Sequence, residues 1–126
     1  MLSFTTVAVS GKGRGKGLGF PTINMQVPAD IPLSLPEGIY AARVTVENEI
    51  YGGALFYGPV PVFDETERSL EVYLVDSGYI SVNPGEEVKV QVLQYIRGVQ
   101  NFSSVELMVL QMEKDVHAVR HALGLI

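Results

Sequence analysis

Apolar and polar side chains alternate through most of this chain, and this period of two predicts strands with one buried face. The clearest case is segment 39–46, where four apolar side chains fall on one face: Tyr40, Ala42, Val44 and Val46. Segment 69–75 repeats the pattern with Leu70, Val72 and Leu74. A third run alternates in the same way, with Val88, Val90 and Val92. These segments predict a fold built mainly of β-strands.

Proline and short polar clusters separate the apolar runs. Pro32 and Pro36 withhold backbone donors, so residues 30–37 are predicted to form a loop. Residues 47–49 are predicted to form the turn of a hairpin. Six strands are therefore expected, at residues 3–9, 22–27, 39–46, 50–57, 69–75 and 88–96. Short strands joined by turns at this spacing favour a β-barrel or a sandwich.

The last part of the chain changes to a helical period. Ser103 and Glu106 fit a capping box at its start, and Gly124 fits a C-terminal stop. Between them lies an apolar stripe, formed by Val105, Val109, Met112, Val116, Val119 and Leu123. Such a stripe predicts a helix that docks on the barrel. The expected fold class is all-β with one C-terminal helix, in a single domain spanning residues 1–126.

Composition narrows the class of protein. The chain has 126 residues, 47% hydrophobic and 18% charged, which is typical of a single globular domain. Because Cys is absent, disulfides and thiolate metal sites are excluded. No apolar run approaches the roughly 20 residues that span a bilayer, and the start does not resemble a signal peptide. The formal net charge of −5 disfavours nucleic-acid binding. We therefore expect a cytoplasmic protein without a membrane or nucleic-acid partner.

One stretch carries the strongest chemical signal. In it, five glycines alternate with three cations: Gly11, Lys12, Gly13, Arg14, Gly15, Lys16, Gly17 and Gly19. Unshielded backbone N–H groups with positive charge suit a polyphosphate. Thr22 and Asn24 follow at once, and their oxygens are ligands that Mg²⁺ prefers. The stretch is not a Walker A motif, because neither Lys precedes Ser or Thr. A surface loop without a ligand, or an edge-strand bulge, stays open as the alternative.

Two further sites carry titratable side chains. Glu71 is a carboxylate in an otherwise apolar strand and is a candidate general base facing the barrel mouth. The alternative is that Glu71 and Tyr73 lie on the solvent face of a half-buried strand. His117 and His121 are one helical turn apart, but they lie off the apolar stripe and have no further ligand in view. We interpret both histidines as solvent-face residues rather than a metal site.

Residues 8–24 read Ala-Val-Ser-Gly-Lys-Gly-Arg-Gly-Lys-Gly-Leu-Gly-Phe-Pro-Thr-Ile-Asn. They closely resemble the signature of the riboflavin kinase (flavokinase) domain, in which a Gly/Arg-rich loop runs into Leu-Gly-Phe-Pro-Thr-Ala-Asn. Further similarities follow in the family's order at residues 38–41, 69–74, 94–104 and 110–115. The resemblance covers nearly the whole chain.

The resemblance implies a six-stranded Greek-key β-barrel with a C-terminal helix. We expect the protein to be a monomer. It implies transfer of the γ-phosphoryl of ATP to the 5′-hydroxyl of riboflavin, which yields FMN and ADP. Glu71 would accept the hydroxyl proton, and Thr22 and Asn24 would bind Mg²⁺ beside the phosphates. The glycine loop, residues 11–19, would close over the phosphates. Arg97 and Phe102 would lie in a second flap beside the flavin ring. Under this hypothesis Glu71 and Thr22 share one site.

Three segments depart from the family's pattern. A polar segment after the hairpin, Asn-x-Gly-x-Arg/Asn-Pro-Thr-Phe in the family, reads Phe-Tyr-Gly-Pro-Val-Pro-Val-Phe at residues 56–63. The family's Asp-Leu-Tyr-Gly stretch near the adenine is altered at residues 79–85, and Tyr73 replaces a polar residue, commonly His. These departures keep a second hypothesis open, a catalytically weak or inactive module that binds flavin or nucleotide. A barrel that binds single-stranded nucleic acid is a third, disfavoured by the acidic charge and the absence of Trp.

Overall fold

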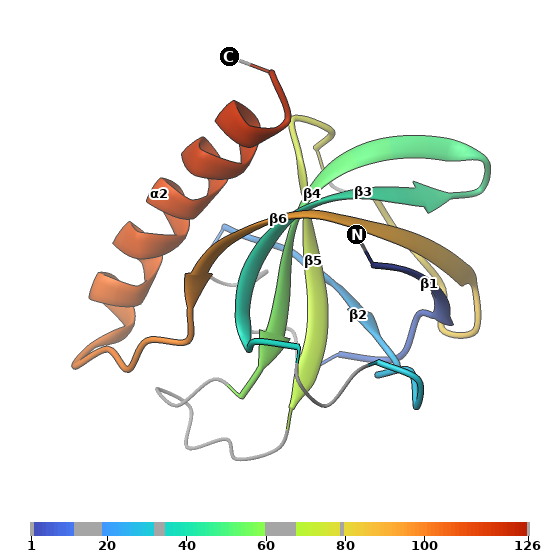
Figure 1. The fold of residues 1–126 in the computed structure, drawn as a ribbon, viewed down its shortest axis with the longest axis horizontal. Helices are drawn as coiled ribbons and strands as arrows, with labels where there is room; N and C mark the ends of the chain where they lie inside the picture. The colour runs from blue at the N-terminus through green and yellow to red at the C-terminus, as the bar shows by residue number, and fades with distance from the viewer. Residues whose placement is uncertain (1, 12–18, 32–34, 60–67, 79, 126) are drawn as a thin grey trace.

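The computed structural model describes residues 2–11, 19–31, 35–59, 68–78 and 80–125 (Figure 1). Within these ranges the chain forms six strands followed by one α-helix, α2. Their bounds are β1 Ser3–Val7, β2 Ile23–Met25, β3 Gly38–Val46, β4 Glu49–Gly58, β5 Ser69–Val75, β6 Glu87–Gly98 and α2 Val105–Ala122. Each predicted element is present, with its ends shifted by a few residues.

The six strands form one antiparallel sheet in the order β1-β6-β3-β4-β5-β2. The sheet curls until its first and last strands meet, because Ala8 forms an antiparallel bridge with Met25. Two backbone hydrogen bonds support this closure: Val9 N–H donates to the Asn24 carbonyl at 2.8 Å, and Gln26 N–H to the Val7 carbonyl at 3.0 Å. The predicted six-stranded Greek-key β-barrel with one C-terminal helix is thus confirmed.

The barrel interior holds the apolar residues that the period of two predicted. Its fully or nearly fully buried members include Tyr40, Ala42, Val44, Val46, Leu70, Val72, Leu74, Val88, Val90 and Val92. Strand β6 continues to Gly98, two residues beyond its predicted end. Its pairing with β3 shifts register between Ile39 and Tyr40 and again between Ala41 and Ala42, and such irregularities bend a strand. This bend carries the end of β6 toward the helix.

Helix α2 packs on the outside of the barrel (Figure 1), where it contacts β3, β4 and β6. Val119 is its most buried residue and joins a second apolar cluster with Ile39, Ala41, Ala54 and Val75. Docking on the barrel is therefore confirmed. The predicted stripe is incomplete, however, because Met108 and Asp115 are buried although neither belongs to it.

The predicted start of the helix is wrong by one residue. Ser104, not Ser103, is the N-cap: its backbone is extended, and its Oγ accepts a hydrogen bond from the N–H of Leu107 at 3.2 Å. The third helical position is therefore Leu107, so the capping box between Ser103 and Glu106 does not form. At the other end the predicted stop is confirmed, because Gly124 has φ 74° and its N–H donates to the His121 carbonyl at 3.1 Å.

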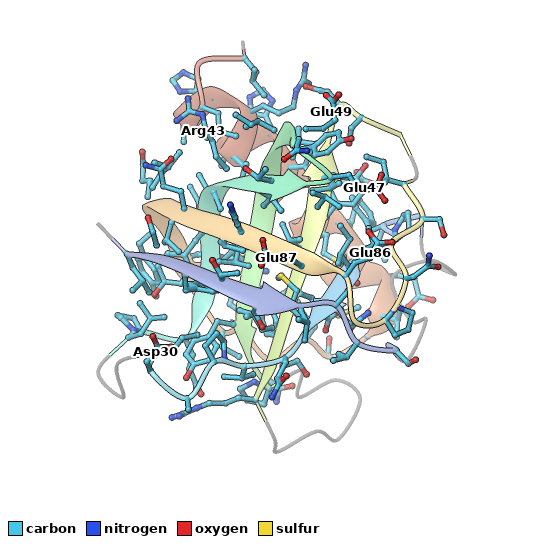
Figure 2. All side chains as sticks on the ribbon, turned by 90° about the vertical axis from the view of Figure 1, so that its right-hand side faces the viewer. Asp30, Arg43, Glu47, Glu49, Glu86 and Glu87 are labelled. Atoms are coloured by element: carbon cyan, nitrogen blue, oxygen red, sulfur yellow. The ribbon has the colours of Figure 1, made fainter. Side chains whose placement is uncertain are left out.

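Figure 2 shows the side of the barrel that faces away from α2. Four carboxylates lie on it, around the β3–β4 hairpin and the start of β6: Glu47, Glu49, Glu86 and Glu87. Arg43 lies on the same side, and Asp30 lies apart from the four. Across the residues that the structure describes, no helix combines the length and apolar character needed to span a bilayer.

We expect Ser104→Ala to lower the free energy of unfolding by about 1 kcal/mol, because the N–H of Leu107 loses its acceptor. Ser103→Ala is the matched control and is expected to change the unfolding free energy by less than about 0.5 kcal/mol, since Ser103 is exposed. Urea unfolding of both variants checks the assignment. An equal loss in the two variants contradicts it.

Candidate active site

The candidate site begins where β2 pairs with β5. The register sets Asn24 opposite Glu71 and the flanking pairs Ile23–Val72 and Met25–Leu70 on either side. The four flanking residues are buried in the barrel. Because successive side chains in a strand point to opposite faces, Asn24 and Glu71 project from the outer face. Glu71 is half-buried there and faces away from the core. It therefore lies on the solvent face of its strand, as the alternative interpretation had it, and not in the barrel mouth.

Thr22 and Glu71 meet directly. The Thr22 hydroxyl, one residue before β2, donates a hydrogen bond to Glu71 Oε1 at 2.8 Å. Their positions are 49 residues apart in the sequence, so the barrel brings them together. The hydrogen bond directs the Thr22 proton toward the carboxylate and leaves lone pairs on the hydroxyl oxygen for another partner. Two residues that the hypothesis assigns to one site are therefore in direct contact.

The first glycine of the loop lies against Asn24. A Cβ at Gly11 would stand 1.8 Å from Asn24 Nδ2 and 2.4 Å from Asn24 Cγ, so a larger residue there would displace this side chain. The other described glycine, Gly19, has φ 87°, a conformation that favours glycine. Residues 12–18 lie outside the described residues, so the expectations for Lys12, Gly13, Arg14, Gly15, Lys16 and Gly17 stay predictions.

Aromatic side chains lie beside Glu71. Phe20 and Tyr73 form an edge-to-face pair with ring centroids 5.3 Å apart. Phe56 stands directly opposite Glu71 in the β4–β5 register. Phe56 and Tyr73 are also packed at the margin of the apolar cluster beneath α2. The carboxylate therefore has apolar neighbours on two strands.

Cross-strand pairing connects Glu71 to further residues on the outer face, from β2 as far as β6. Asn24 pairs with Glu71, Glu71 with Phe56, Phe56 with Ile39, and Ile39 with Arg97. Paired residues share a face, so these five side chains form one row across five neighbouring strands, called here the outer row. Neighbouring strands are about 4.8 Å apart, which sets Glu71 and Arg97 roughly 14 Å apart along the sheet.

Arg97 closes the outer row and is held by α2. Its Nε and Nη2 donate to the two carboxylate oxygens of Asp115 at 2.8 and 2.7 Å, and its Nη1 donates to the Gly98 carbonyl at 2.9 Å. The guanidinium carbon lies 5.9 Å from the centre of the Phe102 ring. The two residues expected at the flavin thus lie together at the end of β6.

The buried Tyr40 and the exposed Tyr95 are neighbours near this end of β6. Tyr40 and Tyr95 pack edge to face, with ring centroids 5.2 Å apart, and the Tyr40 hydroxyl donates to the Pro36 carbonyl. Burial, together with the nearby Tyr95 and Tyr57, raises the pKa of Tyr40 above its usual value of 10.0. Tyr40 therefore keeps its proton at neutral pH and remains a hydrogen-bond donor.

His117 and His121 are both exposed, which confirms their position on the solvent face. Among the described residues no group of three or more His, Cys, Asp or Glu side chains could hold a metal ion. A magnesium ion beside Glu71 would instead use the Thr22 hydroxyl and Asn24 amide oxygens next to that one carboxylate. Hard oxygen donors of this kind are what Mg²⁺ binds, usually with several waters retained.

Comparison with known proteins extends this picture. A family model described as riboflavin kinase matches residues 1–123 of this chain. The chain belongs to the riboflavin kinase family. Human riboflavin kinase is 29% identical over 93% of this chain and 77% of its own length. The RNA-binding riboflavin kinase RibR of Bacillus subtilis is 32% identical over 94% of this chain.

The chain spans half or less of the length of the first curated relatives that it matches. It covers 50% of RibR and 16% of the trifunctional protein RibF/MnmA of Mycoplasmoides gallisepticum, to which it is 32% identical. Among solved structures, the macrolide-efflux protein from Streptococcus pneumoniae superposes with a TM-score of 0.78 and 30% identity, over 94% of this chain and 38% of that one. Riboflavin kinase from Trypanosoma brucei superposes with a TM-score of 0.66 and 23% identity, over 98% and 82%, which supports the fold.

Three residues of the site did not emerge from the sequence. Phe20 and Phe56 occur in segments that the resemblance covers, but only the strand register places them beside Tyr73 and Glu71. Asp115 carried a readable signal: it precedes Val116 by one position and Val119 by four, so it falls on the buried side of the helix. A carboxylate in that position requires a partner, which is Arg97.

Proposed function

We propose that this chain is a riboflavin kinase, which transfers the γ-phosphoryl group of ATP to the 5′-hydroxyl of riboflavin with Mg²⁺ and releases FMN and ADP. The observation that carries the proposal is the outer row. At one end Asn24 and the neighbouring Thr22 supply oxygen atoms, Glu71 follows with a single carboxylate, and Arg97 at the other end lies beside Phe102. The triphosphate of ATP, the riboflavin hydroxyl and the flavin ring would bind in that order along the row.

The length of the outer row supports the orientation of the substrates. Roughly 14 Å separate Glu71 from Arg97 along the sheet. A flavin ring held near Phe102 would extend its ribityl chain past the buried Ile39 and over the half-buried Phe56 toward Glu71. The 5′-hydroxyl then reaches the carboxylate at the end where the phosphates lie. Both ends of the molecule are recognised by different strands of one rigid sheet, which favours precise placement.

The chemistry asks mainly for placement and charge neutralisation. The riboflavin 5′-oxygen forms a bond to the γ-phosphorus, while the bond from that phosphorus to the bridging oxygen of ADP breaks. The hydroxyl proton passes to the Glu71 carboxylate, whose orientation is fixed by the hydrogen bond from Thr22. The half-buried rings of Phe56 and Tyr73 limit the access of water that would compete as the acceptor.

The donor set fits magnesium. The Thr22 hydroxyl oxygen and the Asn24 amide oxygen would hold the ion beside the phosphates, since both are hard oxygen ligands. When bound, Mg²⁺ supplies positive charge that offsets the charge of the triphosphate. The cations Lys12, Arg14 and Lys16 would add to this charge from the glycine loop, and the backbone of Gly11 fixes where that loop starts against Asn24.

The direct experiment incubates the protein with riboflavin, ATP and Mg²⁺ and follows FMN by chromatography, with CTP and GTP run in parallel. We expect FMN to accumulate with Mg²⁺ and to stop when EDTA removes the metal. Riboflavin binding without FMN supports the other hypothesis, an inactive flavin-binding module, which Phe56 beside Glu71 and the altered segment at residues 79–85 motivate. Failure to bind riboflavin or nucleotide contradicts both hypotheses.

Glu71→Gln is expected to reduce kcat by on the order of 10²–10⁴-fold, because the amide accepts the Thr22 hydrogen bond but cannot take up the substrate proton. The unfolding free energy should stay within about 0.5 kcal/mol of the unaltered protein. Steady-state kinetics and urea unfolding measure the two effects. A variant with full turnover contradicts the role of Glu71.

Gly11→Ala is expected to lower kcat/KM for ATP by on the order of 10²-fold, because its methyl group displaces the Asn24 side chain or the start of the loop. The KM for riboflavin should change little. Gly124→Ala is the control: its φ of 74° makes it destabilising, but it lies at the end of α2, away from the outer row. If Gly124→Ala weakens ATP use equally, general destabilisation explains the effect and the role of Gly11 is wrong.

A further inference from the structure

We propose that the buried ion pair between Arg97 and Asp115 is a positioning device for the flavin. It holds residues 97–104, which run from the end of β6 to the start of α2, so that Phe102 stands at the ring end of the outer row. Arg97 acts through this segment and does not itself contact the substrate. The inference rests on the proposed function and assigns a role within the same site.

The pair has the geometry of a rigid clamp. Both Asp115 oxygens accept from Arg97, at 2.8 and 2.7 Å, which is the bidentate arrangement that fixes a guanidinium plane. Gln111 Nε2 donates a further hydrogen bond to Asp115 Oδ1 at 3.0 Å. The side chains are 14% exposed for Arg97 and 4% for Asp115. Solvent and salt therefore weaken this pair little.

The backbone around Arg97 is held as closely as its side chain. A Cβ on Gly38 would lie 2.0 Å from the Arg97 carbonyl oxygen, so β3 packs against the Arg97 backbone at a distance that only glycine allows. The same guanidinium also donates to the carbonyl of Gly98, the next residue along the chain. One side chain thus joins the end of β6, the start of the connecting segment and the helix.

Phe102 lies between the two fixed ends of the segment. Arg97 holds the first end, and the Ser104 cap of α2 holds the second. The Arg97 guanidinium lies 5.9 Å from the Phe102 ring centre, within the range of a cation–π contact. The edge of the guanidinium faces Asp115 and Gly98 while its carbon lies near Phe102. Asp115, Gly98 and Phe102 thus occupy these sides of the Arg97 guanidinium. We therefore assign Arg97 the role of placing the Phe102 ring, not of contacting the flavin.

A contribution to stability alone does not account for the pair. Desolvating two charges costs free energy that their attraction often only offsets, and an apolar pair of similar volume commonly serves as well. The same helix has a second ion pair with the barrel, between Arg120 and Asp76, and its side chains are 35% and 50% exposed. That exposed pair lies beyond the connecting segment. The two ion pairs therefore provide a matched comparison between positioning and simple docking of α2.

The test is Arg97→Lys, which keeps the charge but loses the bidentate contact. We expect the KM and the Kd for riboflavin to rise on the order of 10-fold, with the KM for ATP changed by less than about 2-fold. Flavin fluorescence measures the Kd without turnover. Arg120→Lys is the matched control and is expected to leave both riboflavin constants unchanged. A parallel loss for riboflavin and ATP, or no change for riboflavin, overturns the proposal.

A double-mutant cycle with Phe102→Ala separates positioning from direct contact. If Arg97 acts by placing Phe102, Arg97→Lys produces no further rise in the riboflavin Kd once Phe102 is Ala. Additive effects overturn the proposal, because they mean that Arg97 binds the flavin independently. If Arg97→Lys does not fold, Gln111→Met removes one hydrogen bond from Asp115 and is expected to give a smaller rise in the riboflavin Kd. No rise in that variant overturns the proposal.

The outcomes for the two proposals are distinguishable. If the unaltered protein binds riboflavin without forming FMN, the kinase function is wrong, while the binding constants still test the clamp. If it forms FMN and Arg97→Lys behaves like the unaltered protein, only the clamp is wrong. If the unaltered protein binds no riboflavin, both are wrong.

Discussion

The hydrogen bond from Thr22 to Glu71 is the interaction on which the rest of the site depends. It joins the segment before β2 to the centre of β5, and it exists only in one register of those two strands. A slip by one residue would turn Glu71 into the barrel and bring Leu70 or Val72 to the outside. The buried residues on both strands exclude that slip, so the apolar core determines where the carboxylate stands.

The same sheet also sets the distance between the two ends of the proposed site. The outer row leads from Asn24 over Glu71, Phe56 and Ile39 to Arg97, and each step is one strand wide. Because hydrogen-bonded strands move little relative to one another, the distance from the carboxylate to the aromatic segment is fixed by the fold. Helix α2 completes the far end by supplying Asp115, which fixes Arg97.

The sequence predicted those features that depend on neighbours within one element. The faces of β3, β5 and β6 followed from alternation, because the period of two is a local property. The helix cap was wrong because Ser103 and Ser104 are both plausible caps, and only backbone geometry decides between them. The outer row was not predictable, since it depends on pairings between strands that are distant in the sequence. Asp115 was missed because its partner lies on another element, although its place on the buried side of the helix was visible.

The most direct test of the account is the position of a bound metal. In a crystal structure with Mg²⁺, ADP and FMN, we expect the ion about 2.1 Å from the Thr22 hydroxyl oxygen. The phosphate of FMN should lie beside the Glu71 carboxylate, and the flavin ring should stack near Phe102. A nucleotide and metal bound away from β2, with Thr22 and Glu71 touching neither ligand, would contradict the account.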